Sequence, residues 1–267
     1  MLKQKFLPLF FSLLLLCALS ACGEKATEEP AADSEMYEQY YQIVADLIDT
    51  HGFYVGVDEE YGAYVNWASF GRGFHYGMLH DFEQDGVPEL ICAYWVDNSD
   101  YRTAGESAAD MYVQIYRYAD GQVQKLLERE VPMGPDVVVG MSFPVGNNPY
   151  LWLMENATEG SGEDGSLYTD FYFSIVDGQL VENVLFMESW RIDSDVNPYE
   201  YVYDTRFEVN GQAVEKSVYF EHQPTEFGYT IEPIVALNRD MVVSFVEDLG
   251  QKAGIDAAAV EALLAPQ

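Results

Sequence analysis

The hydrophobic pattern of the chain changes near Gly52. Before that residue, five large apolar side chains recur at helical spacing, with acidic residues between them: Met36, Tyr40, Val44, Leu47 and Ile48. This spacing predicts an amphipathic helix. Ser34 can cap its start, and His51 followed by Gly52 can end it.

After Gly52, short runs rich in Tyr, Phe, Val and Trp alternate with Gly, Asn, Asp and Pro, which predicts successive antiparallel strands. The expected strands cover residues 74–79, 89–95, 111–118, 123–129, 150–154, 167–175, 179–187, 199–209 and 212–220. Three turns have almost the same sequence and centre on Asp120-Gly121, Asp177-Gly178 and Asn210-Gly211. Such pairs supply the positive φ angles that a two-residue hairpin requires.

Two further helices are expected near the C-terminus. Asn238 or Asp240 can begin the first and Gly250 can end it, and the second covers residues 256–264. The fold class is therefore mainly β, with an antiparallel multi-strand sheet, an N-terminal helix and short C-terminal helices. The pattern leaves open a sandwich, a barrel or a propeller-like fragment. The uneven spacing of the three similar turns favours convergent turn chemistry over a repeat.

The first residues have the order of a secretory signal, because Lys3 and Lys5 precede an apolar run over residues 6–19. This run is too short and wrongly flanked for a membrane-spanning helix of the mature protein. The next residues, Leu-Ser-Ala-Cys at 19–22, resemble the lipobox of bacterial lipoproteins. In that family the signal is cut before the cysteine, and the cysteine receives a diacylglyceryl group. The resemblance implies that Cys22 carries lipid and anchors the chain on the extracytoplasmic face of the cell membrane.

Three segments follow from this reading. Residues 1–21 are a signal peptide, and residues 22–34 are the lipidated cysteine with a tether that has no large apolar side chain and should be disordered. Residues 35–267 form a single mainly-β extracytoplasmic domain. The chain is 49% hydrophobic and 15% aromatic, which suffices for a packed core.

The composition limits the partners. Without residues 1–21, 11 Lys and Arg face 45 Asp and Glu, which gives a formal charge of −34. Such a surface repels nucleic acid and attracts cations or a basic partner, although it also suits a solvated surface without a specific partner. Cys17 leaves with the signal, so Cys92 stays alone in an apolar run and is expected to be an inert small hydrophobe. A secreted domain without disulfides agrees with a Gram-positive origin.

One acidic segment between two expected strands has the spacing of a calcium loop. Carboxylates stand at loop positions 1, 3, 5 and 9 and a glycine at position 6: Asp81, Glu83, Asp85, Glu89 and Gly86. Ca²⁺ takes six to eight oxygens, and alternate residues of a tightly curling loop point inward. The segment resembles the Asp-x-Asp-x-Asp-Gly-x-x-Glu-Leu motif of secreted Gram-positive lipoproteins of unknown function. The resemblance covers residues 77–96 and implies as calcium ligands the side chains of Asp81, Glu83, Asp85 and Glu89 and the carbonyl of Val87.

The segment also departs from better-known calcium loops. Position 12, where an EF-hand has its bidentate Glu, is Cys92, which excludes a helix-loop-helix EF-hand. A strand-loop-strand calcium site and a metal-free acidic turn both remain open. A bound Ca²⁺ would neutralise clustered charge and rigidify the hairpin, which is a structural role.

No catalytic motif stands out. The four histidines lack the His-Glu-x-x-His spacing, and no Gly-x-Ser-x-Gly segment occurs. The four tryptophans would suit a sugar-stacking face, but core and cross-strand packing is the first expectation for them: Trp67, Trp95, Trp152 and Trp190. We therefore expect a non-enzymatic domain that binds a cell-wall component, a glycan or a protein. The alternative is an extracytoplasmic hydrolase that uses a carboxylate pair, for example on glycans.

Overall fold

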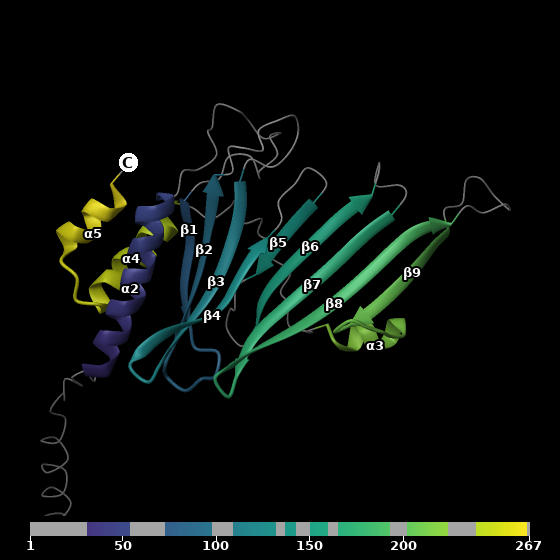
Figure 1. The fold of residues 1–267 in the computed structure, drawn as a ribbon, viewed down its shortest axis with the longest axis horizontal. Coiled ribbons are helices and arrows are strands. Elements are labelled where there is room, and N and C mark those ends of the chain that lie inside the picture. Colours follow the sequence, from purple (N-terminus) through teal and green to yellow (C-terminus); the bar gives the residue numbers. More distant parts are fainter. Residues whose placement is uncertain are drawn as a thin grey trace, which may run out of the picture.

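The computed structural model of the chain describes residues 31–53, 73–97, 109–131, 137–142, 150–159, 165–192, 202–223 and 239–265. Its strands form two antiparallel sheets (Figure 1). The first sheet has the order β1-β2-β3-β4: β1 (Gly73–His80), β2 (Glu89–Asp97), β3 (Ala109–Ala119) and β4 (Gln122–Val131). The second has the order β10-β9-β8-β7-β6-β5: β5 (Val137–Ser142), β6 (Leu151–Glu159), β7 (Gly165–Val176), β8 (Gln179–Ile192), β9 (Val202–Val209) and β10 (Gln212–Ala213). The expected mainly-β antiparallel fold is confirmed.

The two sheets pack face to face, because alternate residues of each strand point into a shared core. From the first sheet this core receives Ile91, Ala93, Trp95, Met111, Val113, Ile115 and Val131, and from the second Leu151, Leu153, Phe171, Phe173 and Ile175. Among the architectures that the sequence left open, this arrangement is a sandwich.

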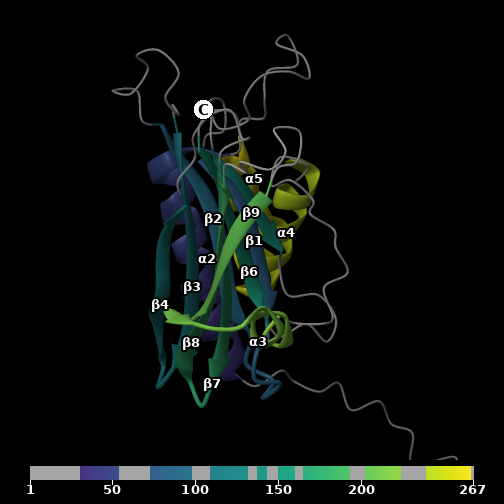
Figure 2. The ribbon, with the colours of Figure 1, turned by 90° about the vertical axis from the view of Figure 1, so that its right-hand side faces the viewer.

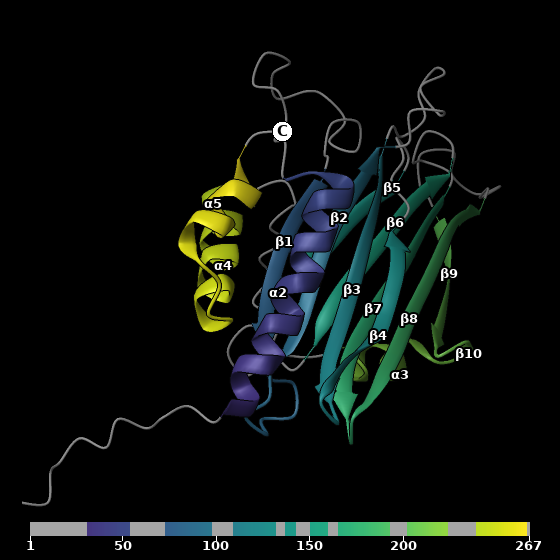
Figure 3. The ribbon, with the colours of Figure 1, turned by 60° about the vertical axis from the view of Figure 1, so that its left-hand side comes forward.

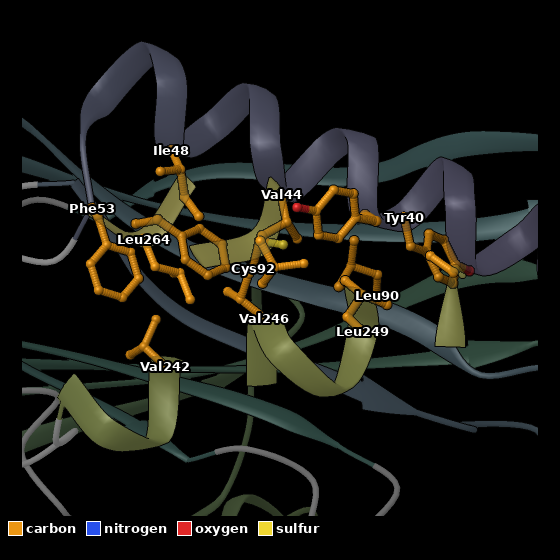
Figure 4. Packing of buried hydrophobic residues seen from close by; sticks show 14 of the residues in the cluster. Tyr40, Val44, Ile48, Phe53, Leu90, Cys92, Val242, Val246, Leu249 and Leu264 are labelled. Carbon is orange, nitrogen blue, oxygen red and sulfur yellow. The ribbon is translucent and has the colours of Figure 1, made fainter. Parts of the chain in front are cut away.

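Helices cover the outer face of the first sheet (Figures 1 and 3). α2 (Ala31–His51) and α4 (Arg239–Lys252) lie on the sheet, and α5 (Ala257–Leu264) packs on these two helices, so the expected N-terminal and C-terminal helices are both present. Leu90 and Cys92 on β2 point toward them, since these residues alternate with the inward-facing Ile91 and Ala93. Figure 4 shows the resulting contacts of Tyr40, Val44 and Ile48 with α4 side chains over β2.

A short helix, α3 (Lys216–Glu221), lies against the outer face of the second sheet beside β9 (Figures 1 and 2). It buries Tyr219 in a separate cluster with Trp152, Tyr172, Leu185 and Val209. Residues 212–220 were expected to form one strand, but only Gln212–Ala213 do so. The helical turn brings Tyr219 onto Phe207, and this tertiary contact outweighs the local preference for strand.

The three similar turns form the two-residue hairpins that the sequence predicts. They join β3 to β4, β7 to β8 and β9 to β10. Their first residues have φ of 53° at Asp120 and 50° at Asp177 and Asn210, and each following glycine has φ between 72° and 77°. Both central residues thus adopt the positive φ of a type I′ turn.

Several element boundaries differ from expectation. Helix α2 begins at Ala31, so Ser34 is not its cap, and the last residues of the expected tether are helical. Gly250 does not end α4, which continues to Lys252. Instead, a Cβ at Gly250 would lie 2.7 Å from Val260 Cγ2, so this glycine permits the close approach of α5. Strand β5 was not expected, because its apolar run is short and lies between Pro- and Gly-containing segments.

Candidate functional site

The acidic segment forms the loop between β1 and β2, at the end of the sandwich where α2 begins and the β3–β4 and β7–β8 turns lie (Figure 1). Side-chain hydrogen bonds hold α2 to this end. Tyr40 Oη donates a hydrogen bond to the Pro88 carbonyl over 3.0 Å, and Gln39 Nε2 donates one to the Gly121 carbonyl over 3.1 Å. The loop is therefore fixed on one side by the first helix of the domain.

Two of the predicted ligands, Asp81 and Asp85, hold the curl of the loop itself. The Asp81 carboxylate accepts hydrogen bonds from the backbone N–H of Asp85 at 3.0 Å and of Gly86 at 2.8 Å. Asp85 Oδ1 accepts the backbone N–H of Val87 at 2.9 Å. The tight curl also requires a positive φ, which is 89° at Gly86.

The other two predicted ligands, Glu83 and Glu89, point toward Arg117 on β3. Arg117 Nη2 lies 3.0 Å from Glu83 Oε2, and Arg117 Nε lies 3.8 Å from Glu89 Oε1. Glu83 also accepts the backbone N–H of Gly178 in the β7–β8 turn, at 3.1 Å. The Arg117 side chain leaves no room for a Cβ at Gly178. The Glu83 carboxylate, paired with Arg117, thus joins the acidic loop of the first sheet to a turn of the second.

Glu89 is the most buried carboxylate of this cluster, with 2% of the residue exposed. Its Oε2 accepts the backbone N–H of Phe82 at 3.2 Å. Burial raises the pKa of Glu89 to about 7, although the Phe82 hydrogen bond and Arg117 act in the opposite direction. Part of the Glu89 population is therefore protonated near neutral pH.

These contacts decide how a calcium ion would fit. In the part of the chain that the structure describes, no three His, Cys, Asp or Glu side chains converge closely enough to hold a metal ion. The Asp81 and Asp85 carboxylates accept hydrogen bonds from backbone N–H groups of the loop. The Val87 side chain packs partly against the helices. To bind the ion, Glu83 would have to give up its ion pair with Arg117 and its hydrogen bond from Gly178. Calcium binding thus stays a prediction, and it requires a rearrangement of Glu83.

The calcium prediction can be tested on the full chain in non-ionic detergent after treatment with a chelator. We expect added Ca²⁺ to raise the unfolding temperature, because an ion that binds only the folded state stabilises it by about 2.7 kcal/mol at a hundredfold excess over Kd. Asp85→Asn keeps a hydrogen-bond acceptor for Val87 but removes the charge, and it should abolish the shift. The control Glu261→Gln removes an exposed charge on α5 and should retain it. Scanning calorimetry measures both, and an unchanged unfolding temperature at millimolar Ca²⁺ would contradict the prediction.

The remaining sequence candidates take packing positions. Cys92 is fully buried between β2 and the helices, and burial raises the pKa of its thiol far above the usual range (Figure 4). Trp95 and Trp152 are buried, as the packing interpretation predicts, whereas Trp190 is 38% exposed. Trp67 lies outside the described residues.

Sequence reasoning missed two charged residues, Arg117 and Asp170. Arg117 shares a strand face with Val113 and Ile115, so a charge at an inward position was the available signal. Asp170 is 8% exposed on the outer face of β7, and Trp152 Nε1 donates a hydrogen bond to its Oδ1 over 2.9 Å. Burial raises the pKa of Asp170 to about 6, and the Trp152 hydrogen bond partly offsets this.

No family model matches the chain, and neither a curated protein nor a solved structure gives a match. The functional argument therefore rests on the residues and contacts given above.

Proposed function

We propose that the protein is an extracytoplasmic lipoprotein, held at the membrane by lipid on Cys22, whose sandwich is a non-enzymatic binding domain. The observation that carries the proposal is the lipobox-like segment ending at Cys22, nine residues before α2 begins at Ala31. Nine residues span at most about 30 Å, so an anchor at Cys22 keeps the start of α2 near the membrane. No helix among the described residues is long and apolar enough to cross a bilayer.

This placement gives the two ends of the domain different surroundings. The acidic loop and the β7–β8 turn share the end at which α2 begins (Figure 1), so an anchor at Cys22 would put them on the membrane side. The last residues of β8 lie at the opposite end, away from the anchor (Figure 1). That end is accessible to a partner outside the membrane.

The alternative, a hydrolase with a carboxylate pair, needs one proton-donating carboxylic acid with a raised pKa beside a second carboxylate that stays ionised. Glu89 and Asp170 both have a raised pKa. Glu89 lies between the two sheets beside Arg117, whereas Asp170 lies on the outer face of the second sheet. Because the second sheet separates them, they do not converge on one substrate. The register partners of Asp170 are Met154 and Leu185, which supply no second carboxylate. Glu89 does have a carboxylate neighbour, Glu83, but Glu89 is 2% exposed and both carboxylates face Arg117, and this burial and pairing support the non-enzymatic proposal.

The anchor is tested by expressing the full chain in a bacterium fed a labelled fatty acid. Wild type should carry the label and stay in the membrane fraction after a high-salt wash, because two or more acyl chains anchor a protein firmly. Cys22→Ser should lose the label and leave the membrane fraction. Cys17→Ser, which changes the other cysteine of the same segment, should behave as wild type. A label that persists in Cys22→Ser, or an unlabelled wild type in the medium, would overturn the proposal.

A further inference from the structure

The second sheet extends past the first on one side. Strand β4 is the last strand of the first sheet, and it packs against β8, while β9 lies one strand further out. Side chains on one face of β8 and β9 therefore extend beyond the inter-sheet core. We name these residues the β8–β9 overhang: Phe186, Glu188, Trp190, Asp204, Arg206 and Glu208.

The strand register puts these side chains on one face. Trp190 pairs with Asp204, Glu188 with Arg206, and Phe186 with Glu208. Directly opposed residues of an antiparallel pair share a face, and so do alternate residues along a strand. Val184 and Leu180 continue the β8 series and pack against the inter-sheet core, which identifies the face as the one toward the first sheet.

The overhang combines an exposed aromatic ring with an excess of negative charge. Trp190 is 38% exposed and lies between Gly165 of β7, which has no side chain, and the exposed Asp204. The Arg206 side chain is 55% exposed; it lies 3.9 Å from Glu188 and also pairs with Glu208. Three carboxylates thus share this face with one guanidinium, which leaves a formal charge of −2 beside the indole ring.

We propose that the β8–β9 overhang docks a basic segment of a partner protein, with an Arg or Lys side chain lying on Trp190 and pairing with Asp204. A cation over an indole ring is attracted by its quadrupole, and a neighbouring carboxylate adds a charge-assisted contact. The excess of carboxylates on this face and across the chain complements a positive partner. The inference rests on the proposed function, because an anchor at Cys22 holds this end of β8 away from the membrane.

The test uses the full chain in non-ionic detergent and a short fluorescein-labelled peptide of alternating Arg and Gly, at physiological ionic strength. Fluorescence anisotropy should show saturable binding. Trp190→Ala and Asp204→Asn should each weaken it about two- to fivefold, because each removes one of the two exposed contacts to the cation. Trp190→Phe keeps an aromatic ring and should lose less. Circular dichroism of each variant checks that the fold is intact.

Matched controls separate docking from general attraction to an acidic protein. Met241→Ala removes another exposed apolar side chain and Glu261→Gln another exposed charge, and both should bind the peptide as wild type does. Equal weakening by the controls, or no binding by wild type, would overturn the proposal. So would Trp190-dependent binding of a neutral glucan oligosaccharide without binding of the peptide. Fatty-acid labelling of the same preparations reports the anchor separately, so a failure of docking is distinguishable from a failure of the proposed function.

Discussion

Arg117→Met is expected to lower the free energy of unfolding by about 2 to 3 kcal/mol at neutral pH, because it leaves partly buried carboxylates without their cation. The Arg117 side chain is 21% exposed, and those of Glu83 and Glu89 are 17% and 3% exposed. Methionine fills a similar volume but supplies no charge and no donors. Urea unfolding measures the difference, and a loss below about 0.5 kcal/mol, which is typical of a surface substitution, would contradict the expectation.

The pH dependence of the free energy of unfolding of Arg117→Met shows whether buried carboxylates cause its loss of stability. The pKa of Glu89 is about 7 in the folded protein, above the ordinary value of 4.5, so its burial costs stability as the pH rises between these values. Removal of Arg117 raises that pKa further, so the variant should lose more stability above pH 7 than below pH 5. Adding Glu83→Gln and Glu89→Gln should restore part of the loss. The control Lys252→Met breaks an exposed ion pair with Asp248, whose two side chains are 40% and 57% exposed, and should change stability by less than about 1 kcal/mol.

Arg117 also shows which parts of the site the sequence could predict. The spacing from Asp81 to Glu89 predicts a curled loop between two strands, and the structure contains it. The prediction of the loop is correct because the curl depends on local hydrogen bonds and on the glycine at position 6. The direction of Glu83 could not be predicted, because Gly178 and Arg117, its partners, are 95 and 34 residues further along the chain. A one-dimensional pattern contains no signal for such contacts between two sheets.

The same distinction holds for the fold. Hairpins such as the one at Asp177-Gly178 were predictable because their φ angles depend on two adjacent residues. The helix at Tyr219 was not, because it forms over Phe207 on a different strand. Gly250 was read as the end of α4, yet its role is contact with Val260 on the next helix. The predictions from sequence are thus wrong where the conformation or role of a residue depends on a neighbour distant in sequence rather than on its own segment.

Asp170→Asn is expected to stabilise the protein by about 2 kcal/mol at pH 8, because the wild-type carboxylate is ionised there at a site that disfavours charge. The pKa of Asp170 is raised from 3.8 to about 6, chiefly by burial. Tyr219 covers the same region, and burial together with the nearby Asp170 raises the pKa of this tyrosine to about 12. The introduced asparagine would keep an oxygen that accepts the Trp152 hydrogen bond, while its new amide donors offset part of the gain.

The sign of the pH dependence makes the Asp170→Asn prediction specific. Well below pH 3.8 the carboxyl is protonated in both the folded and the unfolded chain, so it does not lower the free energy of unfolding. Between pH 4 and 6 only the unfolded chain releases the proton, so wild-type stability falls as the pH rises; above pH 6 the penalty is constant. Asp170→Asn should lack the part of the fall that Asp170 causes and keep the part that Glu89 causes, whereas Asp204→Asn, which removes an equal charge at an exposed position, should keep both. Urea unfolding between pH 4 and 8 compares the three proteins. Parallel curves for both variants would mean that the Asp170 carboxylate is solvated, and that Trp152 and Tyr172 do not exclude water from it.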